Sequence, residues 1–331
     1  MKAGKKMKIY HGLERSGGES AVALGSFDGV HLGHRKVIAM ALGEKSRGLI
    51  PTVLTFEDSP RSSLGGDFGG RILTQEQKIG VLEGLGIEQL YLLDFSSVKD
   101  MTAEAFVRGV LLGVCRAKKA CCGFNFTFGC GGAAGSGDLA RLCADCGIGT
   151  AVAGAVLQGG TPVSSTRIRG LISGGRVDEA AKLLGRPFFY ESPVLPGKHL
   201  GRKLGTPTLN QAVPPGSVLP KFGVYVSSVH IGRDVFCGVT NVGVNPTVGS
   251  EQARVETWMP DYSGPDLYGR TVRVELLKFL RPERRFSGVA QLGEAIRRDG
   301  GQAMEYWRKN GPSRTAEQTK RLLHPSKPEK K

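Results

Sequence analysis

The stretch LGSFDGVHLGH, residues 24–34, lies between two segments of different periodicity. Residues 20–27 (SAVALGSF) form an apolar run as long as a buried strand, and residues 33–48 carry apolar side chains at helical spacing. The stretch is therefore expected to be the end of a strand, a turn that contains glycines, and the start of a helix. A strand followed by a helix is the repeating unit of a parallel α/β sheet.

The same alternation continues through the first half of the chain. Further strand-like runs lie at residues 49–57, 87–95 and 118–124. Between them, Thr74–Gln77 forms a capping box for a helix that Gly86 stops, and another helix is expected over residues 102–117. We therefore predict a Rossmann-like α/β domain, in which a parallel sheet has helices on both faces.

The second half of the chain has a different character. Prolines are frequent, and extended runs lie at residues 222–231, 234–244 and 269–280. Short strands separated by Pro and Gly turns indicate a small β-barrel, which a helix over residues 288–299 follows. The expected division is a first domain over residues 1–185, a second over residues 186–325, and a basic tail over residues 326–331.

The net charge of +15, from 45 Lys and Arg against 30 Asp and Glu, favours anionic partners. Nucleic acid and bound phosphates fit this charge equally well, and part of the excess lies in the two end segments, 2–8 and 327–331. We find no apolar run as long as the roughly 18 residues of a membrane-spanning helix, and no signal-peptide pattern. A cytoplasmic, soluble protein without a membrane partner is expected.

Seven cysteines make a disulfide framework unlikely in an intracellular chain of this length. Five of them lie between Cys121 and Cys146, and Cys143 and Cys146 form a CxxC pair. A zinc site is conceivable, but no second CxxC or paired histidines accompany this pair. We expect small buried thiols instead.

The residue types of the 24–34 stretch suit an anion. Gly29 and Gly33 allow close approach of the backbone to a ligand, and a helix N-terminus offers unpaired N–H groups with a partial positive charge. His31 and His34 could donate hydrogen bonds to phosphate oxygens there. Taken alone, the pair is equally compatible with two structural histidines, whereas a zinc site needs further ligands.

The stretch also resembles a known signature. His31–His34 is similar to the H-x-G-H motif of the adenylyl- and cytidylyltransferase superfamily, which class I aminoacyl-tRNA synthetases share in a related form. The longer G-x-F-D-G-V-H-x-G-H, residues 25–34, resembles the flavin adenylyltransferase module of prokaryotic FAD synthetases. The resemblance implies that both histidines are catalytic. It also implies ATP or phosphate contacts from Gly25, Phe27, Asp28 and Gly33.

A second segment, GFNFTFG at residues 123–129, resembles the flavin-side loop of that module. It implies flavin contacts from Asn125 and Phe126. The alternative is that the phenylalanines of this segment belong to the core.

A third segment, VSSTRIRGLI at residues 163–172, resembles the S-S-T-x-x-R signature of the same module. Ser164, Ser165 and Thr166 can cap a helix and present hydroxyls and N–H groups to phosphates. Arg169 can hold a phosphate with its forked donors, and the resemblance makes it catalytic. A plain helix cap is the alternative.

The implied reaction is attack of an FMN phosphate oxygen on the α-phosphorus of ATP, with release of pyrophosphate. Positioning, Mg²⁺ and cationic groups would carry the catalysis without a side-chain nucleophile. This chain departs from the family where a His-Pro pair commonly follows the second strand, because Asp58, Ser59 and Pro60 stand there. The departure leaves part of the flavin or phosphate contact open.

The second half carries its own candidate site in PGKHLGRKLGTPTLN, residues 196–210. Thr208 and Asn210 offer oxygen ligands suited to Mg²⁺. The segment lacks the P-loop pattern, but it resembles the G-x-x-x-G-R-x-L-G-x-P-T-x-N segment of riboflavin kinases. Its expected phosphate contacts are Gly197, Gly201, Arg202 and Gly205.

Three downstream segments, at residues 241–249, 254–269 and 279–286, follow the order of that family. Glu256 falls on the catalytic glutamate, which would take the proton of the riboflavin 5′-hydroxyl during attack on the γ-phosphate. Arg281 is expected to contact flavin or phosphate, although an exposed arginine is the alternative. Asn245 and Trp258 replace an arginine and a histidine that many relatives carry.

The resemblance covers roughly residues 8–320 and joins both modules in the order of bifunctional riboflavin kinase/FAD synthetases. It implies ATP as co-substrate, riboflavin, FMN and FAD as substrate and product, and no nucleic-acid partner. A monomer or weak self-association is expected. One rival is a nucleotidyltransferase of another small substrate with a non-catalytic barrel. The other is a basic RNA-binding protein that retains the H-x-G-H fold.

Overall fold

The structure is a computed structural model that describes residues 6–58, 69–196, 207–244 and 253–311. By its contacts the chain divides into two compact units. The first comprises Met1–Arg169 with Leu183–Gly185, and the second comprises Gly170–Lys182 with Arg186–Lys331. Residues 170–182, which lie before the expected boundary at residue 185, thus make their contacts within the second unit.

The first unit is built on a six-stranded sheet whose neighbouring strands are all parallel. The strand order is β1-β4-β3-β2-β5-β8. The bounds are β1 Lys8–His11, β2 Ser20–Leu24, β3 Ile50–Phe56, β4 Gln89–Leu93, β5 Ala117–Gly123 and β8 Gly149–Ala153. The predicted parallel α/β sheet is confirmed, and the two edge strands, β1 and β8, were not expected.

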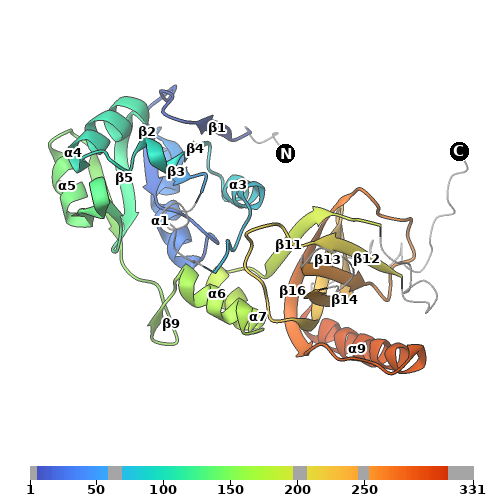
Figure 1. Cartoon of the computed structure of the whole chain (residues 1–331). Helices are drawn as coiled ribbons and strands as arrows, with labels where there is room; N and C mark the ends of the chain where they lie inside the picture. The colour runs from blue at the N-terminus through green and yellow to red at the C-terminus, as the bar shows by residue number, and fades with distance from the viewer. Residues whose placement is uncertain (1–5, 59–68, 197–206, 245–252, 312–331) are drawn as a thin grey trace, which may run out of the picture. The chain divides into compact units, whose positions relative to one another are not determined.

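The helices of the first unit lie on both sides of this sheet (Figure 1). The helices α1 (Leu32–Gly43) and α3 (Gln75–Gly84) connect β2 to β3 and β3 to β4. The chain then crosses back over β2 through α4 (Ala103–Ala105) and η3 (Phe106–Val114) to β5, and α5 (Ser136–Ala144) leads on to β8. The connections β2–β3–β4 run toward one edge of the sheet, and the connections β4–β5–β8 run toward the other. Because such crossovers are right-handed, α1 and α3 lie on one face of the sheet, and α4, η3 and α5 lie on the opposite face.

This reversal of direction makes the carboxyl ends of β2 and β5 the switch point of the sheet. Loops that leave two adjacent strands there go to opposite faces, which opens a crevice where α/β proteins bind ligands. The turn after β2 begins at Gly25, and the loop after β5 begins at Phe124. Two of the three motif segments of the first half, residues 24–34 and 123–129, therefore lie at this point of the sheet.

Local sequence signals set the ends of these helices. The Thr74 side chain accepts from the backbone of Gln77, and the Gln77 side chain accepts from the backbone of Thr74, so the predicted capping box is present. The helix expected over residues 102–117 is confirmed in place but differs in type, because η3 has π-helical hydrogen bonding. Phe106, Val107 and Leu111 of η3 are buried against the sheet.

The cysteines of the first unit are largely core residues. Cys121, Cys122 and Cys143 are buried, whereas Cys130 is exposed, and none forms a disulfide. Burial raises the pKa of Cys121 to about 12 and that of Cys122 to about 11, so both stay protonated and unreactive at neutral pH. No cluster of three or more His, Cys, Asp or Glu suited to a metal ion occurs in the described ranges.

The second unit is built on a six-stranded antiparallel sheet of order β11-β16-β13-β14-β15-β12. The bounds are β11 Phe188–Pro193, β12 Thr208–Ala212, β13 Gly223–Ile231, β14 Asp234–Val244, β15 Ala253–Trp258 and β16 Thr271–Arg281. The strands β13, β14 and β15 follow one another, and β12, which precedes them, lies beside β15 in a Greek-key order.

One bridge brings the two edges of this sheet together. Leu195, just after β11, pairs with Asn210 of β12, and its N–H donates to the Asn210 carbonyl (2.7 Å). The buried polar residues of this sheet include a chain of hydroxyls in which Ser227, Thr240 and Thr257 are linked at 2.7 and 2.8 Å. The predicted barrel is therefore confirmed, because the curled sheet meets itself at this bridge.

Three further helices complete the two units. The helices α6 (Ser165–Ser173) and α7 (Val177–Leu184) join the sheets along the chain. The helix α9 (Val289–Asn310) packs Ala303 and Trp307 against Val226 and Val239 of the barrel, and it extends beyond the predicted residue 299. No helix in the described part of the chain has both the length and the apolar character needed to cross a membrane.

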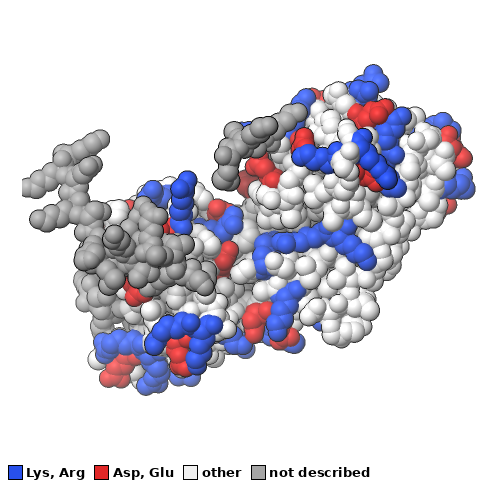
Figure 2. Space-filling view, turned by 180° about the vertical axis from the view of Figure 1, so that it is seen from behind, with Lys and Arg blue, Asp and Glu red and all other residues white. Residues whose placement is uncertain are grey.

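The surface carries charges of both signs. On the face drawn in Figure 2, Lys and Arg side chains are interspersed with Asp and Glu. Many of them are paired, as Arg273 is with Glu191 and Lys278 with Asp178. Such pairing is typical of a solvated surface.

Candidate active sites

The turn after β2 has a strained backbone. Phe27 and Val30 have positive φ angles of 48° and 42°, and Gly29 between them has a φ of 81°. Residues other than glycine rarely adopt this region, and such strain concentrates at functional sites. Phe27 and Val30 are nevertheless almost fully buried, so packing holds the turn in this conformation.

The two histidines lie at the start of α1, as predicted. His31 is the N-cap residue, and its Nδ1 accepts the backbone N–H of His34 (3.3 Å). The two imidazole rings stack with centroids 3.6 Å apart. A Cβ on Gly33 would lie 3.1 Å from the His31 ring, so glycine makes room for the stack here. The first turn of α1 therefore presents two imidazoles together with its N–H groups.

The surroundings keep His34 neutral. Burial lowers the pKa of His34 well below its usual range, and the neighbouring His31 and Lys78 act in the same direction. Its Nδ1 is buried and has no hydrogen-bond partner among the described residues. An unpaired buried polar atom costs free energy, so the position of this imidazole is not explained by stability alone.

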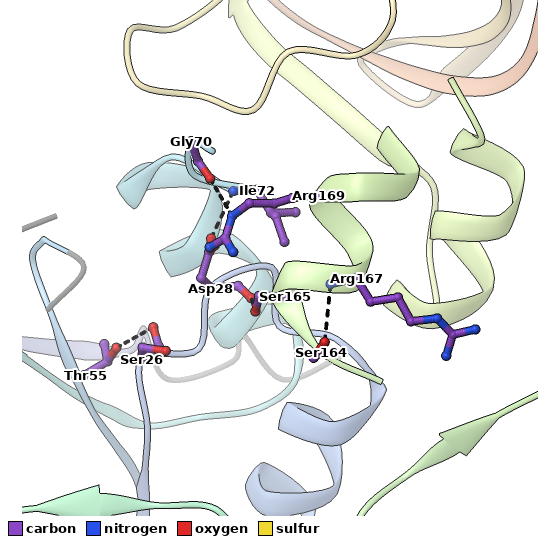
Figure 3. Close-up of polar contacts among 9 residues, drawn as sticks. All are labelled: Ser26, Asp28, Thr55, Gly70, Ile72, Ser164, Ser165, Arg167 and Arg169. Atoms are coloured by element: carbon purple, nitrogen blue, oxygen red, sulfur yellow. Dashed lines mark hydrogen bonds and ion pairs between the residues drawn. The ribbon is translucent and has the colours of Figure 1, made fainter. Parts of the chain in front are cut away.

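Asp28 links three segments of the first unit (Figure 3). Its Oδ1 accepts the N–H of Ile72 (3.0 Å), and its Oδ2 accepts from Nη2 of Arg169 (2.5 Å). Nε of Arg169 donates to the carbonyl of Gly70 (2.7 Å). Burial raises the pKa of Asp28, and Arg169 opposes this effect. Asp28 and Arg169 thus bind each other, and their expected phosphate contacts stay predictions.

The serine-rich segment caps α6 and contacts the turn. Ser164 Oγ accepts the N–H of Arg167 (3.3 Å), which confirms the predicted cap. Ser165 Oγ donates to the carbonyl of Asp28 (2.9 Å), so the start of α6 is fixed against the turn after β2 (Figure 3). Thr166 is exposed. Two helix N-termini, those of α1 and α6, are therefore attached to one turn.

The phenylalanines of the loop after β5 differ in exposure, and the expected flavin contacts of Asn125 and Phe126 stay predictions. Phe126 is half-buried and stacks on Phe128 of the core, with ring centroids 5.6 Å apart. Asn125 is exposed. Phe124, which the sequence reasoning did not single out, is 53% exposed although it is a large apolar residue. The strand–loop boundary at Gly123 could have indicated Phe124, because the first residue after a strand leaves the sheet.

Lys78 is a second residue that the sequence reasoning missed. It lies in the first turn of α3, and its Nζ donates to the carbonyl of Phe56 at the end of β3 (2.9 Å). Only 7% of the residue is exposed. Burial lowers the pKa of Lys78 to about 8, while the charge of Asp28 raises it and that of Arg71 lowers it.

The candidate site of the second unit is a row of polar residues across three strands. In the sheet register, Glu256 of β15 pairs with Asn210 of β12 on one side and Asn241 of β14 on the other. Directly paired residues of antiparallel strands project to the same face, so the three side chains are neighbours. Asn210 is buried and Glu256 is half-buried.

The register also places Thr208 on this face, two residues from Asn210 along β12. Asn210 Nδ2 donates to the carbonyl of Thr208 (3.4 Å), so its amide oxygen is not used in that bond. Asn241 Nδ2 donates to Oε1 of Glu283 (3.1 Å). Asn241 and Glu283 are additional polar residues beside this row: the strand register identifies Asn241, and its hydrogen bond identifies Glu283.

Trp258 and Arg281 both contact helix α9. The Trp258 ring packs at Gly300 of α9, where an added Cβ would lie 2.6 Å from it. Arg281 binds Asp299 of α9 with two donors, Nε at 3.0 Å and Nη2 at 2.7 Å. The expected flavin or phosphate contact of Arg281 stays a prediction.

Several predicted residues lie outside the described ranges. They are Gly197, Gly201, Arg202 and Gly205 of the glycine-rich segment, together with Ser59 and Asn245.

Fold and site define an α/β domain of the nucleotide-handling type joined to a small β-barrel. The FAD synthetase family model matches residues 14–167, and the riboflavin kinase family model matches residues 184–307. The relative from Bacillus subtilis strain 168 is 33% identical over 90% of this chain and 96% of its own length. The relative from Escherichia coli K12 is 31% identical over 92% of this chain and 98% of its own length. Both are named bifunctional riboflavin kinase/FMN adenylyltransferase.

Among solved structures, a Streptococcus pneumoniae protein described as a macrolide-efflux protein has a TM-score of 0.81 and 31% identity, over 90% of this chain and 99% of its own. The chain belongs to the family of bifunctional riboflavin kinase/FMN adenylyltransferases, which are enzymes. The resemblance inferred from the motifs is confirmed at this level, and it is favoured over both rival interpretations.

Proposed function

We propose that this chain phosphorylates riboflavin to FMN on its barrel and adenylylates FMN to FAD in its first unit. The observation that carries the second reaction is the pair His31 and His34 at the N-terminus of α1, beside the switch point of a parallel sheet. Phosphates bind readily at such a helix end.

In the adenylylation, an oxygen of the FMN phosphate attacks the α-phosphorus of ATP. The new P–O bond forms as the bond to the bridging oxygen breaks, and pyrophosphate leaves with the electron pair. His31 and neutral His34 donate hydrogen bonds to the phosphoryl oxygens as this charge develops. The N-terminus of α6 is fixed to the turn after β2 by the Asp28–Arg169 ion pair and the Ser165 hydrogen bond. In that position its N–H groups can bind the same phosphates.

The flavin ring is expected on the β5 side of the switch point. Phe124 is an exposed aromatic ring, and Asn125 next to it carries amide donors and acceptors. An isoalloxazine ring can stack on the first and hydrogen-bond to the second. Phe126, which is packed on Phe128, supports this loop from the core.

In the phosphorylation, the riboflavin 5′-hydroxyl attacks the γ-phosphorus of ATP and ADP leaves. Glu256 accepts the hydroxyl proton, and its half-buried position between two asparagines is consistent with a positioned base. Asn241, which pairs with Glu256 in the register and donates to Glu283, could orient Glu256 or the substrate.

The donor set of β12 fits Mg²⁺. Thr208 and Asn210 would hold it through hydroxyl and amide oxygens, the hard ligands that this ion takes. When bound, the ion would neutralise phosphate charge. In wild-type protein, Mg²⁺ should raise the affinity for a non-hydrolysable ATP analogue at the kinase site, and Asn210→Leu should remove that increase.

We also assign the protein to the cytoplasm, as a monomer or weak self-associate with small-molecule substrates and no nucleic-acid partner. Both reactions consume ATP, which supports the compartment. The interspersed charges of Figure 2 favour small anionic substrates over a long polyanion.

One product analysis tests the whole proposal. Purified protein with riboflavin, ATP and Mg²⁺ should yield FMN and then FAD, separated by chromatography. A protein that turns over ATP with FMN but never phosphorylates riboflavin would instead support the rival with a non-catalytic barrel. RNA affinity with a steep salt dependence and no flavin turnover would support the RNA-binding rival.

A further inference from the structure

Lys78 occupies an unusual position for a lysine. Lys78 is only 7% exposed, and its ammonium group lies at the carboxyl end of β3, where it donates to the carbonyl of Phe56 (2.9 Å). Lysines are almost never this buried unless an anion accompanies them. The burial of Lys78 therefore calls for a counter-charge.

The described residues around it supply none that is available. Asp28 and Asp58 are the carboxylates whose charges act on Lys78. Arg169 is paired with Asp28, and Arg71 is paired with Asp58. The Phe56 carbonyl is the one hydrogen-bond acceptor that Lys78 Nζ has within the described residues. Three cations thus share two carboxylates, and the excess charge is positive.

This excess lies beside the histidine pair. The charge of Lys78 is among the causes that lower the pKa of His34, so the ammonium acts on the candidate phosphate site. The segment before α3 is attached to the turn after β2, because the N–H of Ile72 donates to Asp28. Lys78 is therefore fixed relative to His31 and His34 through that turn.

We propose that Lys78 binds the phosphates of ATP in the adenylyltransferase site, a role that rests on the function proposed above. A polyphosphate would supply a counter-charge beyond the paired carboxylates of the described residues, and lysine binds phosphate as a compact point charge. Its contribution grows as the pyrophosphate leaves, because that group gains charge in the reaction.

The test compares Lys78→Met with Lys78→Arg, and with Lys45→Met as a surface control, since Lys45 pairs with Glu88 and is well exposed. Each variant receives FMN and ATP, and the KM for ATP and the inhibition constant of pyrophosphate are measured. Lys78→Met should raise the KM for ATP and the inhibition constant of pyrophosphate by at least about tenfold. Lys78→Arg should raise them by less, and Lys45→Met should leave both constants unchanged. The riboflavin kinase activity of each variant should be unchanged, and this activity serves as the control for folding.

A second measurement uses the wild-type protein, in case Lys78→Met fails to fold. At pH 9 saturating pyrophosphate should slow the acylation of Lys78 at least about fivefold relative to Lys45, followed by peptide mass spectrometry. Unchanged constants in a folded Lys78→Met, or an unchanged acylation rate, would overturn the proposal. A wild-type protein that forms no FAD from FMN would instead refute the proposed function.

Discussion

The N–H of His34 donates to the ring of His31, which makes a candidate catalytic residue the N-cap of the helix that presents both. Replacement by alanine therefore mixes two effects. His31→Ala should lower the free energy of unfolding by about 1 kcal/mol through the lost cap. His31→Asn keeps a cap of the preferred type and removes only the imidazole.

Both variants should lose FAD synthesis, while only His31→Ala loses stability. Urea unfolding and the rate of FAD formation from FMN separate the two effects, with riboflavin kinase activity as the control. Wild-type FAD synthesis by His31→Asn would show that the ring serves only as a cap.

Asp28 and Arg169 form a largely buried ion pair, so removal of one partner deprives the other of its bonded counter-charge. Asp28→Ala should lower the free energy of unfolding by roughly 3 kcal/mol, because the Arg169 charge and the Ile72 N–H lose their acceptor. A double-mutant cycle with Arg169→Met measures the coupling. The double variant should be more stable than Asp28→Ala alone, and simple additivity would contradict the pairing.

The sequence predicted the fold where local signals agree. The capping box at Thr74, the helix start at His31 and the strand limits of residues 234–244 all depend on near neighbours, and the structure has each of them. Pairings between distant segments left no such signal. The bond from Arg169 to Asp28 spans 141 positions, and Lys78 became a candidate only through its burial.

The same limit applies to the flavin-side loop. The GFNFTFG pattern identified the loop but could not tell which phenylalanine packs in the core. The structure separates them by exposure: Phe126 stacks on Phe128, and Phe124 points away from the core.

Phe124→Ala should therefore raise the KM for FMN by about two- to tenfold with little change in the KM for ATP, because stacking on an aromatic ring contributes about 0.5–1.5 kcal/mol. The matched control is Leu157→Ala, which removes another exposed apolar side chain of the first unit. Steady-state kinetics of FAD formation checks the prediction, and equal effects of the two variants would refute it.

Glu256 allows the two active sites to be separated. Glu256→Gln keeps the size of the side chain but replaces the carboxylate with an amide that cannot accept the proton, so FMN formation should fall by about 10² or more. FAD formation from supplied FMN should continue at the wild-type rate, because that reaction belongs to the other unit. Loss of both activities would contradict two independent sites.

The depressed pKa of Lys78 predicts a pH dependence of stability. Burial lowers the pKa from 10.5 to about 8, so between these values the unfolded chain holds a proton that the folded chain has released. The free energy of unfolding contributed by this group therefore rises with pH in that window, by roughly 3 kcal/mol in total, and the cost of burying the charge is fully present below pH 8.

Lys78→Met lacks this rise. Urea unfolding of both proteins at pH 7.5 and pH 10 measures it, because other groups titrate alike in the two. Equal changes in wild type and variant would show that Lys78 keeps an ordinary pKa.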